Sequence, residues 1–250
     1  PQLKICANMS VGYNNLDVPA MTRHGVLATN APDVLTETTA DFGFALMMAA
    51  ARRVTESEHF LRAGQWKQWR YDLFAGAEVH GSTLGIMGMG RIGQVIAKRA
   101  AHGFGMRVIY HNRSRLSTDL ETACKATYVG KEELLRTADH VMLVVPYSAE
   151  SHHTIGAKEL SCMKPSATLV NIARGGIVDD AALAKALAAS ARCTGVAKLP
   201  GRLAHSLANS TPETKAWACR TAFSRASVVF SVLTVTCLSK RVLGLLKVVV

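Results

Sequence analysis

Short, continuous apolar runs separated by amphipathic stretches fill the first three quarters of the chain. The runs predict buried strands over Leu3–Ala7, Val26–Thr29, Leu84–Met87, Met106–Tyr110, Ala126–Val129, His140–Val145 and Ala167–Ile172. The stretches predict helices over Asp17–His24, Thr36–Ala63, Arg91–His102, Lys131–Arg136, Ala157–Met163 and Ala181–Ala188. Alternation of continuous apolar strands with helices is typical of a parallel sheet covered on both faces. The pattern therefore predicts an α/β fold with a doubly wound, Rossmann-like parallel sheet.

A glycine-rich turn joins the strand Leu84–Met87 to the helix that follows it. Gly88, Gly90 and Gly93 have the Gly-x-Gly-x-x-Gly spacing of dinucleotide-binding turns. The first glycine permits the tight turn, the second lets a pyrophosphate approach the backbone, and the third allows close packing of helix on strand. The free N–H groups of the first helical turn, which contains Arg91 and Ile92, would bind the phosphates. The turn predicts a dinucleotide site.

The residues after the second strand of this unit indicate which nicotinamide cofactor binds. An NAD site usually has a carboxylate there, which accepts hydrogen bonds from the ribose hydroxyls. This chain has Asn112, Arg113, Ser114 and Arg115 instead. No carboxylate is present here to repel a 2′-phosphate, while two guanidinium groups and a hydroxyl could bind one. We therefore predict NADP(H) in preference to NAD(H), the alternative being an ordinary solvated basic loop.

Six ordered motifs give the chain a family resemblance from Leu3 to about Leu187. They are SVGYNNLD, TNAPDVLTETTAD, GMGRIG, HNRSR, LVVPYSAESHHTIG and NIARGGIVDDAALAKAL. Together they resemble the D-isomer-specific 2-hydroxyacid dehydrogenases, and among these the glyoxylate/hydroxypyruvate reductases. The resemblance implies an oxidoreductase, a homodimer in the parent family, that reduces a small 2-oxo acid to the D-2-hydroxy acid with a nicotinamide cofactor.

The resemblance also implies roles for individual residues. Arg174 matches the arginine that holds the substrate's carboxylate and 2-oxo oxygen, and a guanidinium suits that task because it binds two oxygens at once. The backbone N–H groups of Ser10, Val11 and Gly12 would clasp the same carboxylate. The remaining matches lie along the cofactor: Thr39 beside the nicotinamide, Val145 and Pro146 flanking the adenosine, and Ile172, Ala173 and Arg174 under the nicotinamide ribose.

The family pattern breaks after Ala188. The resemblance calls for a downstream glutamate and a downstream histidine that delivers the proton to the alkoxide, and neither motif is present. The downstream residues His205 and Glu213 fit neither in their flanks nor in their order. We therefore expect impaired catalysis. The alternatives are a non-catalytic module that binds a dinucleotide and a partner, as the family's corepressors do, or a defective gene product.

Charge divides the chain at the same place. Residues 1–189 carry 20 Lys and Arg against 17 Asp and Glu, whereas residues 190–250 carry 9 basic residues and one acid. The net charge of +11 is thus mainly a property of the tail, which argues against a nucleic-acid partner. We predict a remnant of a smaller substrate domain over 1–34, preceded in the family by further elements. The dinucleotide-binding domain then covers 35–189, and 190–250 is an aberrant tail produced by a frameshift, an intron or a wrong gene model.

Other features of the sequence narrow the class of protein and its expected location. The six cysteines lack Cys-x-x-Cys spacing, which predicts neither a metal site nor a disulfide framework. No secretory signal is visible, and the apolar run 228–250 is interrupted by Lys240 and Arg241, so we expect a cytoplasmic protein without a membrane span. Four aromatics after Gly64 suit core packing or a subunit contact better than substrate stacking: Trp66, Trp69, Tyr71 and Phe74.

Overall fold

A computed structural model describes residues 2–193. The chain divides into two compact units, and the first, Pro1–Ala186, contains both sheets. Two parallel strands, β1 (Ile5–Ala7) and β2 (Leu27–Thr29), flank α1 (Val18–Arg23) and form a small separate sheet. The predicted tail lies outside the described residues, apart from the end of the last helix.

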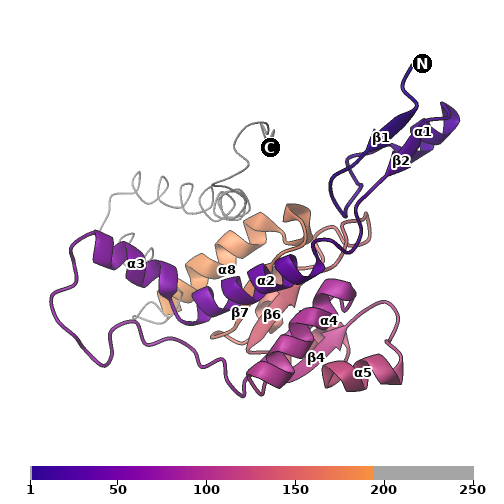
Figure 1. The fold of residues 1–250 in the computed structure, drawn as a ribbon. Coiled ribbons are helices and arrows are strands. Elements are labelled where there is room, and N and C mark those ends of the chain that lie inside the picture. The colour runs from indigo at the N-terminus through magenta and orange to yellow at the C-terminus, as the bar shows by residue number, and fades with distance from the viewer. Residues whose placement is uncertain (1, 194–250) are drawn as a thin grey trace. The chain divides into compact units, whose positions relative to one another are not determined.

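A five-stranded parallel sheet follows, as the apolar pattern predicted (Figure 1). Its strands, in the spatial order β5-β4-β3-β6-β7, are Ala126–Tyr128, Arg107–His111, Thr83–Met87, His140–Leu143 and Thr168–Asn171. The helices are α2 (Thr36–Ala51), α3 (Val54–Arg62), α4 (Arg91–Lys98), α5 (Thr118–Cys124), α6 (Lys131–Thr137), α7 (Ala157–Cys162) and α8 (Asp180–Cys193). A π turn, Arg99–Gly103, extends α4, and a 3-10 turn, Gly175–Ile177, follows β7. The chain winds outward from β3 in both directions, which confirms the doubly wound, Rossmann-like class.

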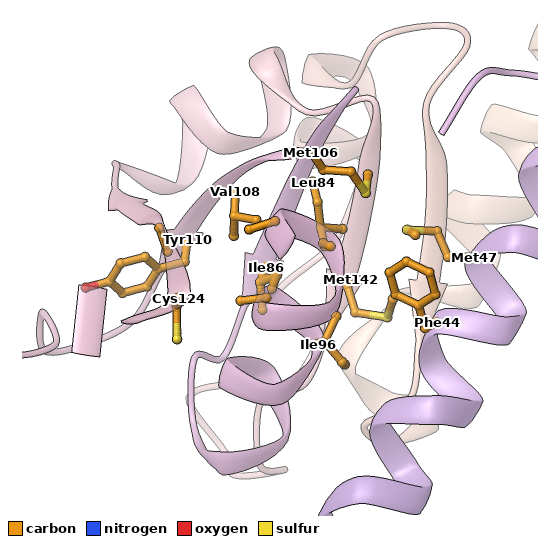
Figure 2. Packing of buried hydrophobic residues seen from close by; sticks show 14 of the residues in the cluster. Phe44, Met47, Leu84, Ile86, Ile96, Met106, Val108, Tyr110, Cys124 and Met142 are labelled. Carbon is orange, nitrogen blue, oxygen red and sulfur yellow. The ribbon is translucent and has the colours of Figure 1, made fainter. Parts of the chain in front are cut away.

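Two apolar clusters bury the two faces of this sheet. Leu84 and Ile86 of β3 lie with Met142 in the cluster under α2 and α4, and all three are fully buried. Figure 2 shows Phe44 and Met47 of α2 pointing toward this cluster. On the other face, α6 approaches so closely that a methyl group on Gly85 would lie 2.7 Å from Leu134. Successive side chains of β3 point to opposite faces of the sheet, so this one strand contributes to both apolar clusters.

The structure divides the predicted helix Thr36–Ala63 in two. Arg53 adopts a left-handed conformation, with φ of 56°, between α2 and α3. The loop from α3 to β3 crosses at this point, where the N–H of Ala77 donates to the carbonyl oxygen of Ala51 at 2.9 Å. Gly76 packs against the same carbonyl, and a side chain there would overlap it. The prediction of one continuous helix was wrong because a distant segment ends it.

Two smaller differences concern the unit around the glycine turn. The predicted helix Arg91–His102 ends as an α-helix at Lys98 and continues as the π turn. The helix α5 was not predicted, because its seven residues, TDLETAC, carry few apolar positions. It lies beside α4 and covers the end of the β4–β5 side of the sheet. Its position matters for the cofactor loop described below.

The amino-terminal edge of the sheet holds a buried histidine. His140 begins β6 with 1% of its surface exposed, and its Nδ1 has no hydrogen-bond partner within the described residues. Its Nε2 lies 3.5 Å from the carbonyl oxygen of Glu78. Burial lowers the pKa of His140, against the opposing influence of that carbonyl and of the adjacent Asp139 carboxylate. The Asp139 carboxylate is itself held by the N–H of Thr83 and by Lys164.

Candidate cofactor and substrate site

The glycine turn lies at the carboxyl edge of the sheet, where the winding direction reverses between β3 and β6. Gly88 has φ of 101°, and a methyl group there would lie 2.6 Å from the carbonyl carbon of Val144 and 2.7 Å from the nitrogen of Val145. The turn and the end of β6 are therefore in direct contact. In doubly wound sheets the crevice at such a switch point is the usual ligand site.

The space beside Gly90 is open, in contrast to the space beside Gly88. No atom lies within 4 Å of where a Cβ of Gly90 would be. Gly90 is the N-cap of α4 and supplies no capping side chain, so the first N–H groups of that helix have no partner in the helix itself. An open approach to unpaired N–H groups at the positive end of a helix fits a dinucleotide pyrophosphate.

The two other residues predicted in this turn differ in exposure. The Nε of Arg91 pairs with an Asp33 carboxylate oxygen at 2.9 Å, and both side chains are exposed. Ile92 is partly buried and packs against the cluster under α2 and α4. The Ile92 side chain therefore serves the local packing, whereas the Arg91 guanidinium stays exposed at the start of α4.

The loop after β4 is tied to the glycine turn by Asn112. Its Oδ1 accepts a hydrogen bond from the N–H of Met89 at 2.7 Å. The side chain that stands where an NAD site usually has a carboxylate is thus used to hold the turn. Arg113 and Ser114 follow, both exposed, and within residues 2–193 the Arg113 guanidinium has no hydrogen bond or ion pair.

Arg115, in contrast to Arg113, forms an ion pair with the helix α5. Its Nε and Nη2 donate to the two carboxylate oxygens of Glu121 at 2.9 and 2.8 Å. The Tyr110 hydroxyl donates to the same carboxylate at 2.7 Å. Hydrogen bonds from Arg115 and Tyr110 hold the pKa of Glu121 below its usual range. Burial and the neighbouring Glu121 raise the pKa of Tyr110 to about 12, so this hydroxyl stays protonated.

Arg174 follows β7 at the same edge of the sheet, and its side chain reaches the loop that follows β1. A methyl group on Gly12 would overlap the Arg174 guanidinium, so the two residues are in contact. The Ser10 hydroxyl donates to the carbonyl oxygen of Gly12 at 2.6 Å. Within the described residues, the N–H groups of Val11 and Gly12 have no acceptor. The structure therefore brings a guanidinium and two unpaired N–H groups together, an arrangement suited to a carboxylate ligand.

Three asparagines support these loops, and sequence reasoning missed them. Asn8 donates to the carbonyl oxygen of Gly12 at 2.8 Å, and Asn30 donates to that of Val11 at 2.9 Å. Asn171 accepts from the N–H of Ala173 and donates to the carbonyl oxygen of Arg174. Each stands within two residues of a strand end, where asparagine commonly fixes a turn, and that placement was the available signal.

The remaining predicted positions lie around the same edge. Thr39, partly buried, precedes Gly43 by one turn of α2, and Gly43 would meet Ile172 at 2.9 Å if it carried a methyl group. The middle of α2 therefore lies over the end of β7 at Ile172, whereas Ala173 packs against the cluster on the α6 face. Val145 packs against the cluster on the α6 face, whereas Pro146 is exposed. His205 and Glu213 lie outside the described residues.

The described part of the chain holds neither a metal-binding cluster nor a membrane-spanning helix. No group of three or more His, Cys, Asp or Glu side chains lies close enough to hold a metal ion there. Within the same residues, no helix has the length and apolar character to cross a bilayer.

The sheet order, the glycine turn at the switch point and the open helix N-terminus define a dinucleotide-binding domain of the Rossmann class. Residues 44–197 match the family described as D-isomer specific 2-hydroxyacid dehydrogenase, NAD binding domain. The chain belongs to this family.

Relatives of known name agree with this assignment. A glyoxylate reductase of Thermococcus gammatolerans is 51% identical over 191 residues, which are 75% of this chain and 57% of the relative. A glyoxylate reductase structure from Paecilomyes thermophila has a TM-score of 0.67 at 39% identity, covering 75% of this chain and 55% of that one. A D-lactate dehydrogenase from Aquifex aeolicus, complexed with NAD and lactic acid, has a TM-score of 0.66 at 32% identity, covering 74% and 54%. The chain thus spans little more than half the length of these relatives.

Proposed function

We propose that this chain carries the cofactor site and part of the substrate site of an NADPH-dependent reductase of small 2-oxo acids of the glyoxylate or hydroxypyruvate type. The observation that carries the proposal is the contact between the Arg174 guanidinium and Gly12, at the sheet edge that also holds the glycine turn. The names of the relatives support glyoxylate as the first substrate to test.

Each group at this edge has a distinct task in the proposal. The Arg174 guanidinium binds the substrate's carboxylate and polarises its 2-oxo oxygen, while the N–H groups of Val11 and Gly12 bind the other carboxylate oxygen. The backbone beside Gly90 binds the pyrophosphate, and Arg113 with Ser114 binds a 2′-phosphate. When bound, the cofactor supplies the hydride.

Proton delivery is where we propose that this chain is deficient. The family glutamate and histidine have no counterpart in its sequence, and loss of a general acid costs about 10²–10⁴-fold in rate. We therefore expect the chain to bind NADPH and a 2-oxo acid, with turnover far below that of a complete family member.

A titration tests this proposal directly. The purified chain is titrated with NADPH and with NADH while nicotinamide fluorescence is followed, and glyoxylate is then added to the NADPH complex. We expect saturable binding, tighter for NADPH, and a further fluorescence change with glyoxylate that Arg174→Gln abolishes. Arg136→Gln, which removes an exposed arginine on α6, serves as the matched control. Absence of a glyoxylate response in the unmodified chain would contradict the substrate assignment, and rapid oxidation of NADPH would contradict the deficiency.

We extend the proposal to a homodimer through the segment after Gly64. Trp66, Trp69 and Tyr71 are 52%, 78% and 87% exposed, whereas Phe74 packs edge-to-face against Phe60. Neighbouring exposed aromatics on one loop suit a subunit contact. Sedimentation of the purified chain tests this: a dimer that Trp69→Ser converts to monomer supports the contact, and a monomeric unmodified chain refutes it.

A further inference from the structure

The carboxylate of Glu121 is held in place by a buried tyrosine. Tyr110, the penultimate residue of β4, is fully buried, and its hydroxyl donates to Glu121 at 2.7 Å and accepts the N–H of Leu116 at 2.8 Å. Glu121 is 9% exposed. Because the tyrosine also binds the backbone at the end of the loop, the carboxylate and the loop have a fixed relation to each other.

This fixed carboxylate selects one of the two arginines of the loop. Arg115 binds it through two parallel hydrogen bonds at 2.9 and 2.8 Å, although 65% of the arginine side chain is exposed. The positive charge of Arg115 and the negative charge of Glu121 are in contact, so the pair presents almost no net charge to the solvent. Arg113, two residues earlier, has no such partner within the described residues and keeps its full positive field.

We propose that Glu121 is a specificity-determining residue, which limits the chain's preference for a 2′-phosphorylated dinucleotide by occupying the Arg115 guanidinium. The inference rests on the proposed NADPH site. In that site Arg113 binds the 2′-phosphate, and Arg115 adds little attraction for the phosphate as long as Glu121 holds its guanidinium. Removal of the Glu121 charge would leave a second cation beside the phosphate.

The expected size of the effect follows from surface electrostatics. The substitution Glu121→Gln keeps an oxygen for the Tyr110 hydroxyl and removes one negative charge near a dianionic phosphate. Partly screened charges at such a surface change affinity by modest factors, so we expect the Kd for NADPH to fall about 3- to 10-fold. The Kd for NADH, which lacks the phosphate, should change less than about 2-fold. The salt dependence of NADPH binding should become steeper.

The experiment compares four forms of the full 250-residue chain by fluorescence titration with NADPH and NADH at low and high salt. They are the unmodified chain, Glu121→Gln, the double variant Arg115→Ala/Glu121→Gln, and the control Glu132→Gln. Glu132 also pairs with an arginine, Arg136 at 2.7 Å, but it lies on α6, which covers the opposite face of the sheet. Circular dichroism and thermal melting establish that each form is folded.

The proposal is supported if Glu121→Gln tightens NADPH binding alone, and if the double variant returns to the affinity of the unmodified chain or below it. It is overturned if Glu121→Gln leaves or weakens NADPH binding, tightens NADH equally, or keeps its gain without Arg115. An unmodified chain that binds both cofactors equally contradicts the proposed NADPH preference, while a gain specific to NADPH in Glu121→Gln still supports the role of Glu121. Failure of every form to bind either cofactor overturns both.

Discussion

Two glycines of the same turn should respond to alanine in opposite ways. At Gly88, φ of 101° is a conformation that L-residues rarely adopt, and the methyl group would lie 2.6 Å from Val144 and 2.7 Å from Val145, both backbone atoms. At Gly90, φ is −76° and no atom lies within 4 Å. We therefore expect Gly88→Ala to damage the fold and Gly90→Ala to leave it intact while closing the approach of a pyrophosphate.

The magnitude at Gly88 has two parts. A left-handed conformation costs a residue with a Cβ about 1–2 kcal/mol. Overlap with backbone that cannot rotate away adds about 1–3 kcal/mol, as for other overpacked interiors. A loss of about 2–5 kcal/mol corresponds to a melting temperature lower by roughly 5–15 °C in a domain of this size. At Gly90 the same change should alter the melting temperature by less than about 2 °C.

Thermal melting by circular dichroism and titration with NADPH together separate the two effects. We expect Gly88→Ala to lose both stability and binding, and Gly90→Ala to lose at least about 10-fold in affinity at unchanged stability. A Gly88→Ala chain that melts with the unmodified chain would refute the packing argument. A Gly90→Ala chain that binds NADPH normally would refute the placement of the pyrophosphate.

Further predictions concern the interior. Burial lowers the pKa of His140 below its unfolded value of about 6.5, so the unfolded state takes up the proton more readily. The melting temperature should therefore be retained above about pH 6.5 and fall as the pH drops below it. The substitution His140→Leu should make this fall smaller, and a variant with the same pH profile as the unmodified chain would contradict the argument. Phe44→Ala should lower the free energy of unfolding in urea by about 3–5 kcal/mol, and a loss under about 1 kcal/mol would show that α2 is not packed as described. Tyr110→Phe should cost about 1–3 kcal/mol by the same measurement, because Leu116 and Glu121 each lose a partner, and a neutral result would contradict the buried network.

The sheet could be predicted from sequence because each of its strands is a short apolar run, and the runs fall within two residues of the observed strands. The break between α2 and α3 could not, since nothing in the Arg52–Arg53 pair marks a helix end. It is imposed by contacts with Ala77 and Gly76, about twenty-five residues downstream.

Contacts between distant segments also decide the structure of the loop after β4, which the sequence pattern could not show. Arg113 and Arg115 are equivalent in the sequence, and only the helix α5 distinguishes them by presenting Glu121. Because α5 is polar and short, its pattern was too weak to predict, and with it the partner of Arg115 was missed. The contact of Arg174 with Gly12 likewise joins segments far apart in the chain, so spacing alone could not show it.

The bond from Met89 to Asn112 bears on how this scaffold could change its cofactor over evolutionary time. An aspartate at position 112 has the same shape and could accept the same N–H with one oxygen, leaving the second oxygen for ribose hydroxyls. The turn would keep its anchor through such a substitution. A single-residue path between the two cofactor classes therefore stays open at this position, because the anchoring contact tolerates both side chains and only the charge they present differs.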